Sequence, residues 1–252
     1  MTSTDTATLE SRAEGRFDIC AKAAEIHGWL EPVTARRTVD ILRWQEASGI
    51  TGNLLEVGVM CGKYFSLLVD SALRQRNQVL GIDTFQYTNT ARVDREMEKA
   101  LGASAKDAYT LWECMSSMVS AQDILDQIGQ PRFISVDGAH DYENVYNDME
   151  MADALLAPNG IVAADDFLNP LTLGVNQAVN AFLSRPRRMV PVAFIGNKLF
   201  LAHRSEADGY RAAIEDIFRA GSDEAATGFI NRASHGRHHI EQPLHGHPVL
   251  IG

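Results

Sequence analysis

Cysteine is scarce in this sequence, and its three cysteines (Cys20, Cys61 and Cys114) lie far apart. Their number and spacing argue against a disulfide framework and against a CxxC metal or redox site. No apolar run reaches the ~18 residues that a membrane helix needs. Residues 1–18 are polar and lack the apolar core of a signal peptide. We therefore expect a soluble, cytoplasmic protein.

Positive charge is also in short supply. The chain has 23 basic against 33 acidic residues, a net charge of −10. A nucleic acid or an anionic membrane needs a basic face, so we expect neither as a partner. In contrast, 45% of the 252 residues are hydrophobic, which excludes disorder throughout and is enough for a large buried core.

Short apolar segments alternate with amphipathic segments along most of the chain. The expected strands are 53–58, 79–83, 110–114, 132–137, 160–165, 190–195 and 198–202. The expected helices between and after them are 65–72, 92–101, 145–156, 175–182 and 210–217. This alternation predicts an α/β fold with a Rossmann-like, doubly wound, mostly parallel seven-stranded sheet. The last two strands flank Gly196-Asn197 and are expected to form an antiparallel hairpin.

The chain divides into four predicted parts. Residues 1–15 are expected to be a disordered N-terminus and residues 16–50 a helical extension. Residues 51–205 form the predicted core, and residues 206–252 a C-terminal helix with a histidine-rich tail. A polar tail is favoured over a zinc site for these histidines, because no cysteine accompanies them. They are His235, His238, His239, His245 and His247. The extensions at both ends are compatible with a homodimer.

In a doubly wound sheet, ligands bind beyond the carboxyl ends of the strands. Four expected strands carry carboxylates at that end: Glu56, Asp83, Asp137 and the pair Asp165-Asp166. The informative residues are therefore those in or just after these strand ends.

The first strand leads into a glycine-containing turn, Glu56-Val57-Gly58-Val59-Met60-Cys61-Gly62-Lys63-Tyr64. The dinucleotide pattern GxGxxG would need glycine at positions 60 and 63, and the spacing of Gly58 and Gly62 does not fit a P-loop. The pattern E-x-G-x-x-x-G fits without a gap. Asp83 follows at the end of the second strand, where a carboxylate can accept hydrogen bonds from two ribose hydroxyls. The alternatives are a packing turn without a ligand and a capping role for Asp83.

The next two carboxylate-bearing strands are expected to be neighbours, about 4.8 Å apart. Asp137, Asp165 and Asp166 would then converge at one sheet edge, where unpaired carboxylates repel. A hard cation such as Mg²⁺, Mn²⁺ or Ca²⁺ would relieve this repulsion, and a capping role for Asp165 or Asp166 is the alternative. His140 follows Asp137 closely and could take a proton from an acceptor hydroxyl. Asp141 would either orient this imidazole or cap a helix.

The residues from Glu56 to about Phe182 resemble a known enzyme family. The E-x-G-x-x-x-G pattern resembles the first motif of class I S-adenosylmethionine-dependent methyltransferases. The segment FISVDGAHDYENVYND (133–148), followed by Ala157-Pro158-Asn159-Gly160 and Asp165-Asp166-Phe167, is similar to one subgroup. That subgroup comprises the metal-dependent O-methyltransferases that act on sugar hydroxyls of glycosylated antibiotics, including macrolides, and of polysaccharides.

The resemblance implies roles for individual residues. His140 would be the general base, and Asp137, Asp165 and Asp166 would hold Mg²⁺ or Mn²⁺. S-adenosylmethionine would be bound by Glu56, Val57, Gly58, Gly62, Lys63, Tyr64, Asp83, Thr84, Ser116, Ser117 and Asp137. The family usually has a Gly-Asp-Ser-like segment after the third strand, whereas this chain has Met115-Ser116-Ser117. The missing acid weakens the assignment of an adenine contact.

The predicted function is therefore Mg²⁺-dependent methyl transfer from S-adenosylmethionine to a sugar hydroxyl of a glycoside or oligosaccharide, with mannose-type acceptors included. A catechol or phenol O-methyltransferase is the alternative, although that group typically has lysine at the position of His140 and Asp-Asn after the fifth strand. A nicotinamide oxidoreductase is opposed by Met60 and Lys63. A donor-binding assembly subunit without activity is the non-enzymatic alternative.

Overall fold

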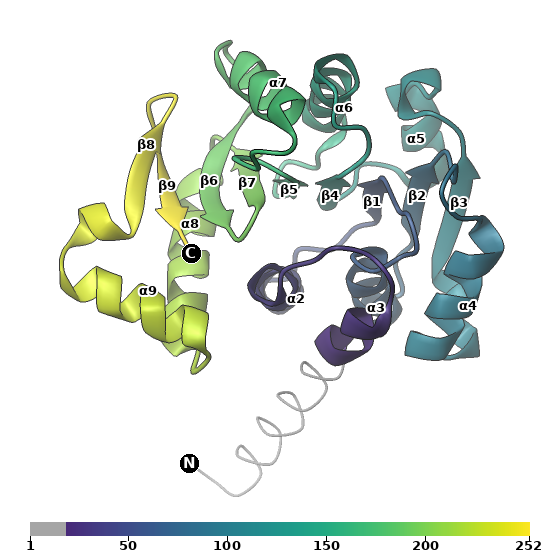
Figure 1. Cartoon of the computed structure of the whole chain (residues 1–252), viewed down its shortest axis with the longest axis horizontal. Coiled ribbons are helices and arrows are strands. Elements are labelled where there is room, and N and C mark those ends of the chain that lie inside the picture. Colours follow the sequence, from purple (N-terminus) through teal and green to yellow (C-terminus); the bar gives the residue numbers. More distant parts are fainter. Residues whose placement is uncertain (1–18) are drawn as a thin grey trace, which may run out of the picture.

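The computed structural model describes residues 19–252, so the disorder predicted for residues 1–15 lies outside the described residues. Residues 19–25 are helical, and the next helix begins at Pro32, in the predicted N-terminal extension. The rest of the chain forms a single sheet with helices on both faces (Figure 1). No helix within residues 19–252 is both long and apolar enough to cross a membrane.

The sheet has nine strands in the order β3-β2-β1-β4-β5-β7-β6-β9-β8. The strands are β1 (Leu54–Val57), β2 (Val79–Asp83), β3 (Tyr109–Glu113), β4 (Phe133–Val136), β5 (Ile161–Ala164), β6 (Met189–Ile195), β7 (Lys198–His203), β8 (Glu241–Leu244) and β9 (His247–Ile251). Strands β1 to β5 pair in parallel, and β7 is antiparallel to both β5 and β6. All seven strands expected from the sequence are present. The inner strands β1, β4 and β5 are buried throughout, which explains their continuous apolar runs.

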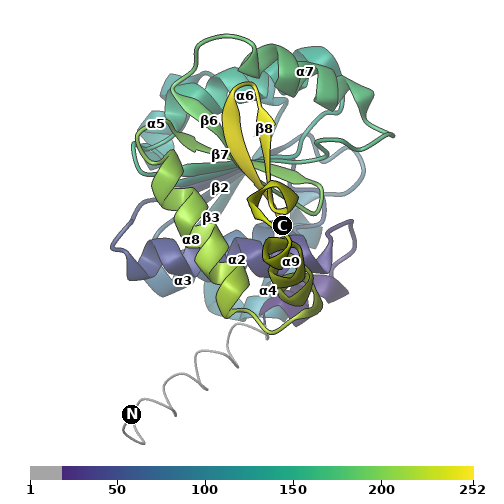
Figure 2. The same ribbon diagram turned by 90° about the vertical axis from the view of Figure 1, so that its left-hand side faces the viewer.

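Helices cover both faces of the sheet, as a doubly wound fold requires (Figures 1 and 2). One face carries α2 (Pro32–Ala47), α3 (Phe65–Gln75), α4 (Thr90–Leu101), α8 (Ala207–Ala220) and α9 (Glu224–Ser234). The other carries α5 (Ala121–Ile128), α6 (Tyr142–Leu155) and α7 (Leu173–Leu183). Each face has its own apolar core. Helix α5 was not expected from the sequence, because it is short and buries only Ile124 and Ile128.

The C-terminal part differs from the predicted helix and histidine-rich tail. Helix α9 follows α8, and β8 and β9 then extend the sheet, with β9 running parallel to β6. Val249 and Leu250 are buried and anchor this extension. The sequence signal is weak because Pro243 and Pro248 interrupt two very short strands, and proline is tolerated in strands only at edges and strand starts.

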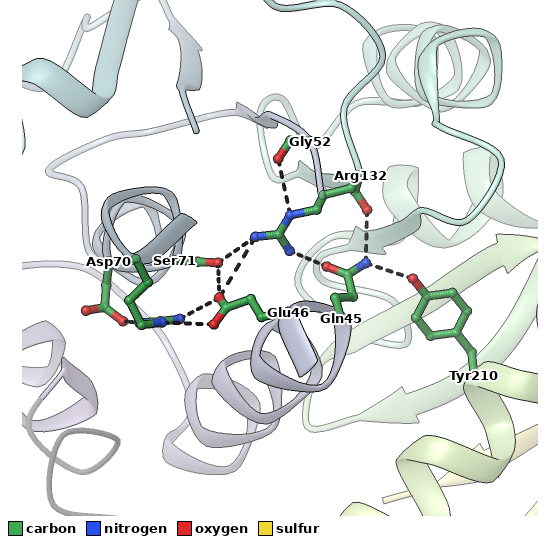
Figure 3. A network of polar contacts seen from close by, with 8 residues as sticks. Gln45, Glu46, Gly52, Asp70, Ser71, Arg132 and Tyr210 are labelled. Carbon is green, nitrogen blue, oxygen red and sulfur yellow. Dashed lines mark hydrogen bonds and ion pairs between the residues drawn. The ribbon is translucent and has the colours of Figure 1, made fainter. Parts of the chain in front are cut away.

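A polar network joins the helices α2, α3 and α8 to the amino end of β4 (Figure 3). The Arg132 side chain is fully buried. Its guanidinium donates to the Ser71 hydroxyl at 2.7 Å and to the Gly52 carbonyl at 3.2 Å, and it also donates to Gln45. The Gln45 amide in turn donates to the Tyr210 hydroxyl at 2.7 Å. This network stabilises the end of the sheet that lies away from the carboxyl ends of the parallel strands.

Candidate active site

A cavity of about 1480 Å³ lies at the carboxyl ends of the parallel strands. Loops after β1, β2, β3, β4 and β5 contribute to its wall, as expected for a doubly wound sheet. The predicted residues that line it are Glu56, Val57, Gly58, Lys63, Tyr64, Asp83, Thr84, Ser116, Asp137, His140, Asp165 and Asp166. Gly62 and Ser117 are not among the lining residues. The structure thus brings almost all predicted site residues around one space.

The turn after β1 depends on Gly58. This residue has φ 89°, and its N–H donates to the Ile82 carbonyl at 2.8 Å. A Cβ atom at this position would lie 1.9 Å from the Asp137 carbonyl oxygen, so no other residue fits without moving the backbone. At Gly62, also left-handed with φ 91°, an added Cβ would lie 2.8 Å from the Met97 side chain. Gly62 therefore permits close packing against α4.

Asp83 connects the first two loops of the site. Its carboxylate accepts hydrogen bonds from the Met60 N–H at 2.7 Å and from the Phe85 N–H at 2.6 Å. Two backbone donors fix the carboxylate at the cavity wall. Each carboxylate oxygen has a further lone pair, so Asp83 can still accept hydrogen bonds from ligand hydroxyls.

Lys63 and Tyr64 hold the N-terminal region against the glycine turn. The Lys63 ammonium donates to the Gly28 carbonyl at 2.9 Å, next to Trp29, whose side chain is exposed at the cavity rim. The Tyr64 hydroxyl lies 3.0 Å from the Thr38 hydroxyl in a buried contact. Both residues thus have structural contacts in this protein, and their predicted contacts with a cofactor stay predictions.

A buried lysine stands between the carboxylates of β4 and β5. The two strands pair in parallel as predicted, with Val136 opposite Ala164, so Asp137 and Asp165 lie side by side just beyond them. The Lys198 ammonium lies 2.7 Å from Asp165 Oδ1 and 3.4 Å from Asp137 Oδ2. Its side chain is 1% exposed. Sequence reasoning missed Lys198, although it is the first residue of a strand after a predicted hairpin turn.

The surroundings shift the pKa values of these acids in opposite directions. Burial and the charge of Asp165 raise the pKa of Asp137 well above its usual range. Burial opposes ionisation of Asp165 too, but the neighbouring Lys198 charge holds the pKa of Asp165 below its ordinary value. Burial also raises the pKa of Glu56, whose Oε2 is buried without a hydrogen-bond partner. Asp165 is therefore the more acidic member of the pair, and it lies nearer to the ammonium.

His140 lies on the loop after β4 with its imidazole about half exposed. Its Nε2 is 3.4 Å from Asp166 Oδ2. Asp166 has a left-handed backbone, with φ 57°, and its other oxygen accepts from the Asn169 amide at 2.8 Å. Asp141 caps helix α6 by accepting from the Asn144 N–H at 3.0 Å. Of the two roles considered for Asp141 the structure therefore supports the cap, and Asp166 is the acid beside the imidazole.

The predicted metal ligands offer the right chemistry but not the expected arrangement. Carboxylate oxygens suit Mg²⁺ or Mn²⁺. However, Asp137 and Asp165 face the Lys198 ammonium, and Asp166 faces His140 and Asn169. Between residues 19 and 252, no three His, Cys, Asp or Glu side chains converge in a way that could hold a metal ion. As arranged, these residues do not fit a divalent cation.

Comparison with known protein families agrees with this geometry. Residues 55–167 match the family described as a methyltransferase domain. The matched segment is thus similar to a methyltransferase domain. The match begins in β1 and ends just after the Asp165-Asp166 pair, so it includes the glycine turn, Asp83 and His140. No curated protein matches the sequence of this chain.

Three solved structures resemble this chain over about two thirds to three quarters of its length. CalS11, a TDP-rhamnose 3′-O-methyltransferase of calicheamicin biosynthesis, is 18% identical with a TM-score of 0.51, over 66% of this chain and 77% of CalS11. The O-methyltransferase NovP is 14% identical with a TM-score of 0.53, over 67% of this chain and 80% of NovP. MycE of the mycinamycin pathway, solved with Mg, SAH and mycinamycin VI, is 14% identical with a TM-score of 0.52, over 74% of this chain and 53% of MycE. These likenesses show that the chain shares the fold of these methyltransferases.

Proposed function

We propose that this protein transfers a methyl group from S-adenosylmethionine to a hydroxyl of a sugar in a glycoside or oligosaccharide, with His140 as general base. One observation supports the proposal above all. His140 lines the same cavity as the Glu56–Gly58 turn and Asp83, so the base and the residues suited to the donor face one space. The sugar methyltransferase CalS11 shares the fold, which is compatible with this acceptor class.

The residues around the glycine turn fit S-adenosylmethionine. Gly58 lets the backbone turn tightly beside the cavity, and Asp83 presents a carboxylate that two backbone N–H groups already orient. Glu56 contributes a buried oxygen without a partner. When bound, S-adenosylmethionine supplies a methyl group on a sulfonium, which leaves as a neutral thioether. Asp83 would accept from the ribose hydroxyls, and Ser116 would lie near the adenine.

The chain's own groups would position the acceptor and remove its proton. The acceptor O–H proton passes to the His140 imidazole while the oxygen lone pair forms the new bond to the methyl carbon and the C–S bond breaks. Asp166, 3.4 Å from Nε2, stabilises the imidazolium that forms. A sugar hydroxyl is a weak acid, so alignment of the two reactants supplies much of the rate enhancement.

Four further predictions from the sequence stand beside this proposal. The catechol or phenol alternative uses the same cavity, where the exposed Trp29 and Tyr87 rings offer flat apolar faces. The Mg²⁺ or Mn²⁺ requirement stays a prediction from the sequence, which the Lys198 contacts oppose. A possible homodimer and a cytoplasmic location likewise stay predictions.

The test is labelled methyl transfer from S-adenosylmethionine to a panel of saccharides, glycosides and catechols, with Mg²⁺ and with chelator. We expect methyl transfer to a saccharide or glycoside. The His140→Ala variant should transfer the methyl group at least about 100-fold more slowly, while its binding of S-adenosylmethionine, measured by calorimetry, should be unchanged. Asp83→Asn should instead weaken donor binding. His238→Ala, an exposed histidine outside the cavity, is the matched control. Transfer to catechols alone would refute the sugar acceptor, and full activity of His140→Ala would refute the base.

A further inference from the structure

Strand order places Lys198 at the site. Strand β7 runs antiparallel to β5 with Leu199 opposite Ala164, so the residue before Leu199 lies opposite Asp165. The β6–β7 turn is short, since Ile195 pairs with Lys198 itself. Figure 1 shows β7 between β5 and β6. The first residue of β7 is therefore carried to the carboxyl ends of the parallel strands, where the acids lie.

The Lys198 ammonium is enclosed by groups that favour positive charge. It lies 2.7 Å from Asp165 Oδ1 and 3.4 Å from Asp137 Oδ2. The Tyr64 ring lies on another side, 4.4 Å from the nitrogen to the ring centroid. With 1% of its side chain exposed, this lysine cannot extend into water. A buried ammonium without a counter-charge is strongly disfavoured, so the lysine and the acids require one another.

This ammonium competes with a cation at the same acids. A divalent ion bound by Asp137 and Asp165 would sit about 2.0–2.6 Å from their oxygens, within a few ångströms of Lys198, and the two positive charges would repel. The third predicted ligand, Asp166, is turned toward His140 and the Asn169 amide. The carboxylate repulsion that suggested a metal is thus already relieved by a side chain of this protein.

We propose that Lys198 is the permanent counter-ion of Asp137 and Asp165, in the place where a divalent cation was expected, and that this protein transfers methyl groups without a divalent metal. The second half of the proposal rests on the proposed function, whereas the first half concerns the carboxylate pair alone. Lys198 is a positioning residue: it holds the two acids at the ends of β4 and β5 without touching the reacting atoms.

The decisive experiment is a Mn²⁺ titration of the full chain followed by electron paramagnetic resonance, with and without S-adenosylhomocysteine. We expect the wild-type protein to leave the free Mn²⁺ signal unchanged. Lys198→Met should bind Mn²⁺ at least about tenfold more tightly than wild type, because removing a nearby positive charge leaves two acids without a counter-ion. Lys99→Met, at an exposed lysine on α4, is the matched control and should behave as wild type.

Two results would overturn the inference. The first is that the wild-type protein binds one Mn²⁺ per chain and that the Asp165→Asn variant does not bind it. The second is a Lys198→Met variant that is folded by circular dichroism yet leaves free Mn²⁺ unchanged. If that variant does not fold, the wild-type titration still decides. Methyl transfer by wild type should change by less than about twofold with chelator. A metal-dependent enzyme would lose far more, because loss of even an outer-shell partner of a metal typically costs ~10–100-fold in affinity or activity. Failure to methylate any acceptor would count against the proposed function only, because the Mn²⁺ titration needs no acceptor.

Discussion

Replacing Gly58 by alanine tests the central turn of the site. The added Cβ would lie 1.9 Å from the Asp137 carbonyl oxygen and 2.7 Å from the Gly138 Cα. Carbon atoms in contact prefer separations of about 3.5–4.0 Å, so the loops after β1 and β4 must separate by more than about 1 Å. Two backbone hydrogen bonds, each 2.8 Å long, hold these loops: the Asp137 N–H donates to Val57 in β1, and the Gly58 N–H donates to Ile82 in β2. The separation would break the Asp137–Val57 bond, and displacement of the Gly58 turn would weaken its bond to Ile82.

The cost of Gly58→Ala is the sum of backbone strain and clash. Alanine at the left-handed φ of 89° costs about 1–2 kcal/mol. Two buried hydrogen bonds left unmade cost about 1–3 kcal/mol each if their groups find no other partner. We therefore expect a loss of about 3–8 kcal/mol in the free energy of unfolding. For a chain of this size, that corresponds to a fall in Tm of about 6–32 °C.

Gly102→Ala separates the two contributions. Gly102 has the same φ of 89°, but an added Cβ there would meet nothing within 4 Å, so Gly102→Ala carries backbone strain of about 1–3 kcal/mol without a clash. Thermal and denaturant unfolding measure both variants, and calorimetry measures S-adenosylmethionine binding. We expect Gly58→Ala to be the less stable by about 2 kcal/mol or more and to lose donor binding, while Gly102→Ala binds normally. Equal stability of the two variants, or donor binding by Gly58→Ala at wild-type strength, would refute the reasoning.

Three further predictions concern stability. Arg132→Met removes a fully buried guanidinium and its contacts with Ser71 and Gln45. We expect the free energy of unfolding, measured with denaturant, to fall by about 3–5 kcal/mol. A fall below about 1 kcal/mol would contradict a structural role. Burial raises the pKa of Asp148 to about 6, so the folded state holds this proton more tightly and loses stability as pH rises from about 4 to 6. The Asp148→Asn variant should not show that loss, and its free energy of unfolding at pH 7 should exceed that of wild type by up to about 3 kcal/mol. A pH profile of Tm that matches wild type would refute this assignment. Burial tends to raise the pKa of Asp223, but the Ala226 N–H and Arg37 lower it to about 2. The ionised Asp223 therefore stabilises the fold above about pH 4, and this stabilisation is lost as the pH falls through about 2. Asp223→Asn should lower Tm at pH 7 but not at pH 2, and an equal fall at both would count against the ion pair.

The parallel half of the fold could be predicted because its strands are buried on both faces. The run Leu54–Val57 is buried throughout. Such an apolar run can be predicted as a strand without knowledge of the strands beside it. The C-terminal strands, β8 at the sheet edge and β9 next to it, give no such signal. Each spans four or five residues that include a proline, and their pairing depends on the presence of β6. The sequence therefore predicts the centre of this sheet better than its C-terminal edge.

The acids of the site could be predicted for a related reason. In a parallel sheet the residue after each strand faces the same edge, so Asp83, Asp137 and Asp165 are expected near one another from strand positions alone. Their electrostatic environment could not be derived in the same way. It depends on which positive group lies among them, and Lys198 is 33 and 61 residues from Asp165 and Asp137 along the chain.

Lys198 was not predicted as a site residue because lysines in such sequence positions are usually exposed. A lysine that follows a Gly-Asn hairpin turn is normally exposed, and fully buried lysines are rare. The order β5-β7-β6 reverses this expectation. Strand β7 runs antiparallel to its neighbour β5. Its first residue, and not its last, therefore lies at the carboxyl ends of the parallel strands. In this topology the residue that opens the antiparallel strand is as much a site position as the residue that ends each parallel strand. A charged side chain there should be considered together with the strand-end acids before a metal is assigned to them.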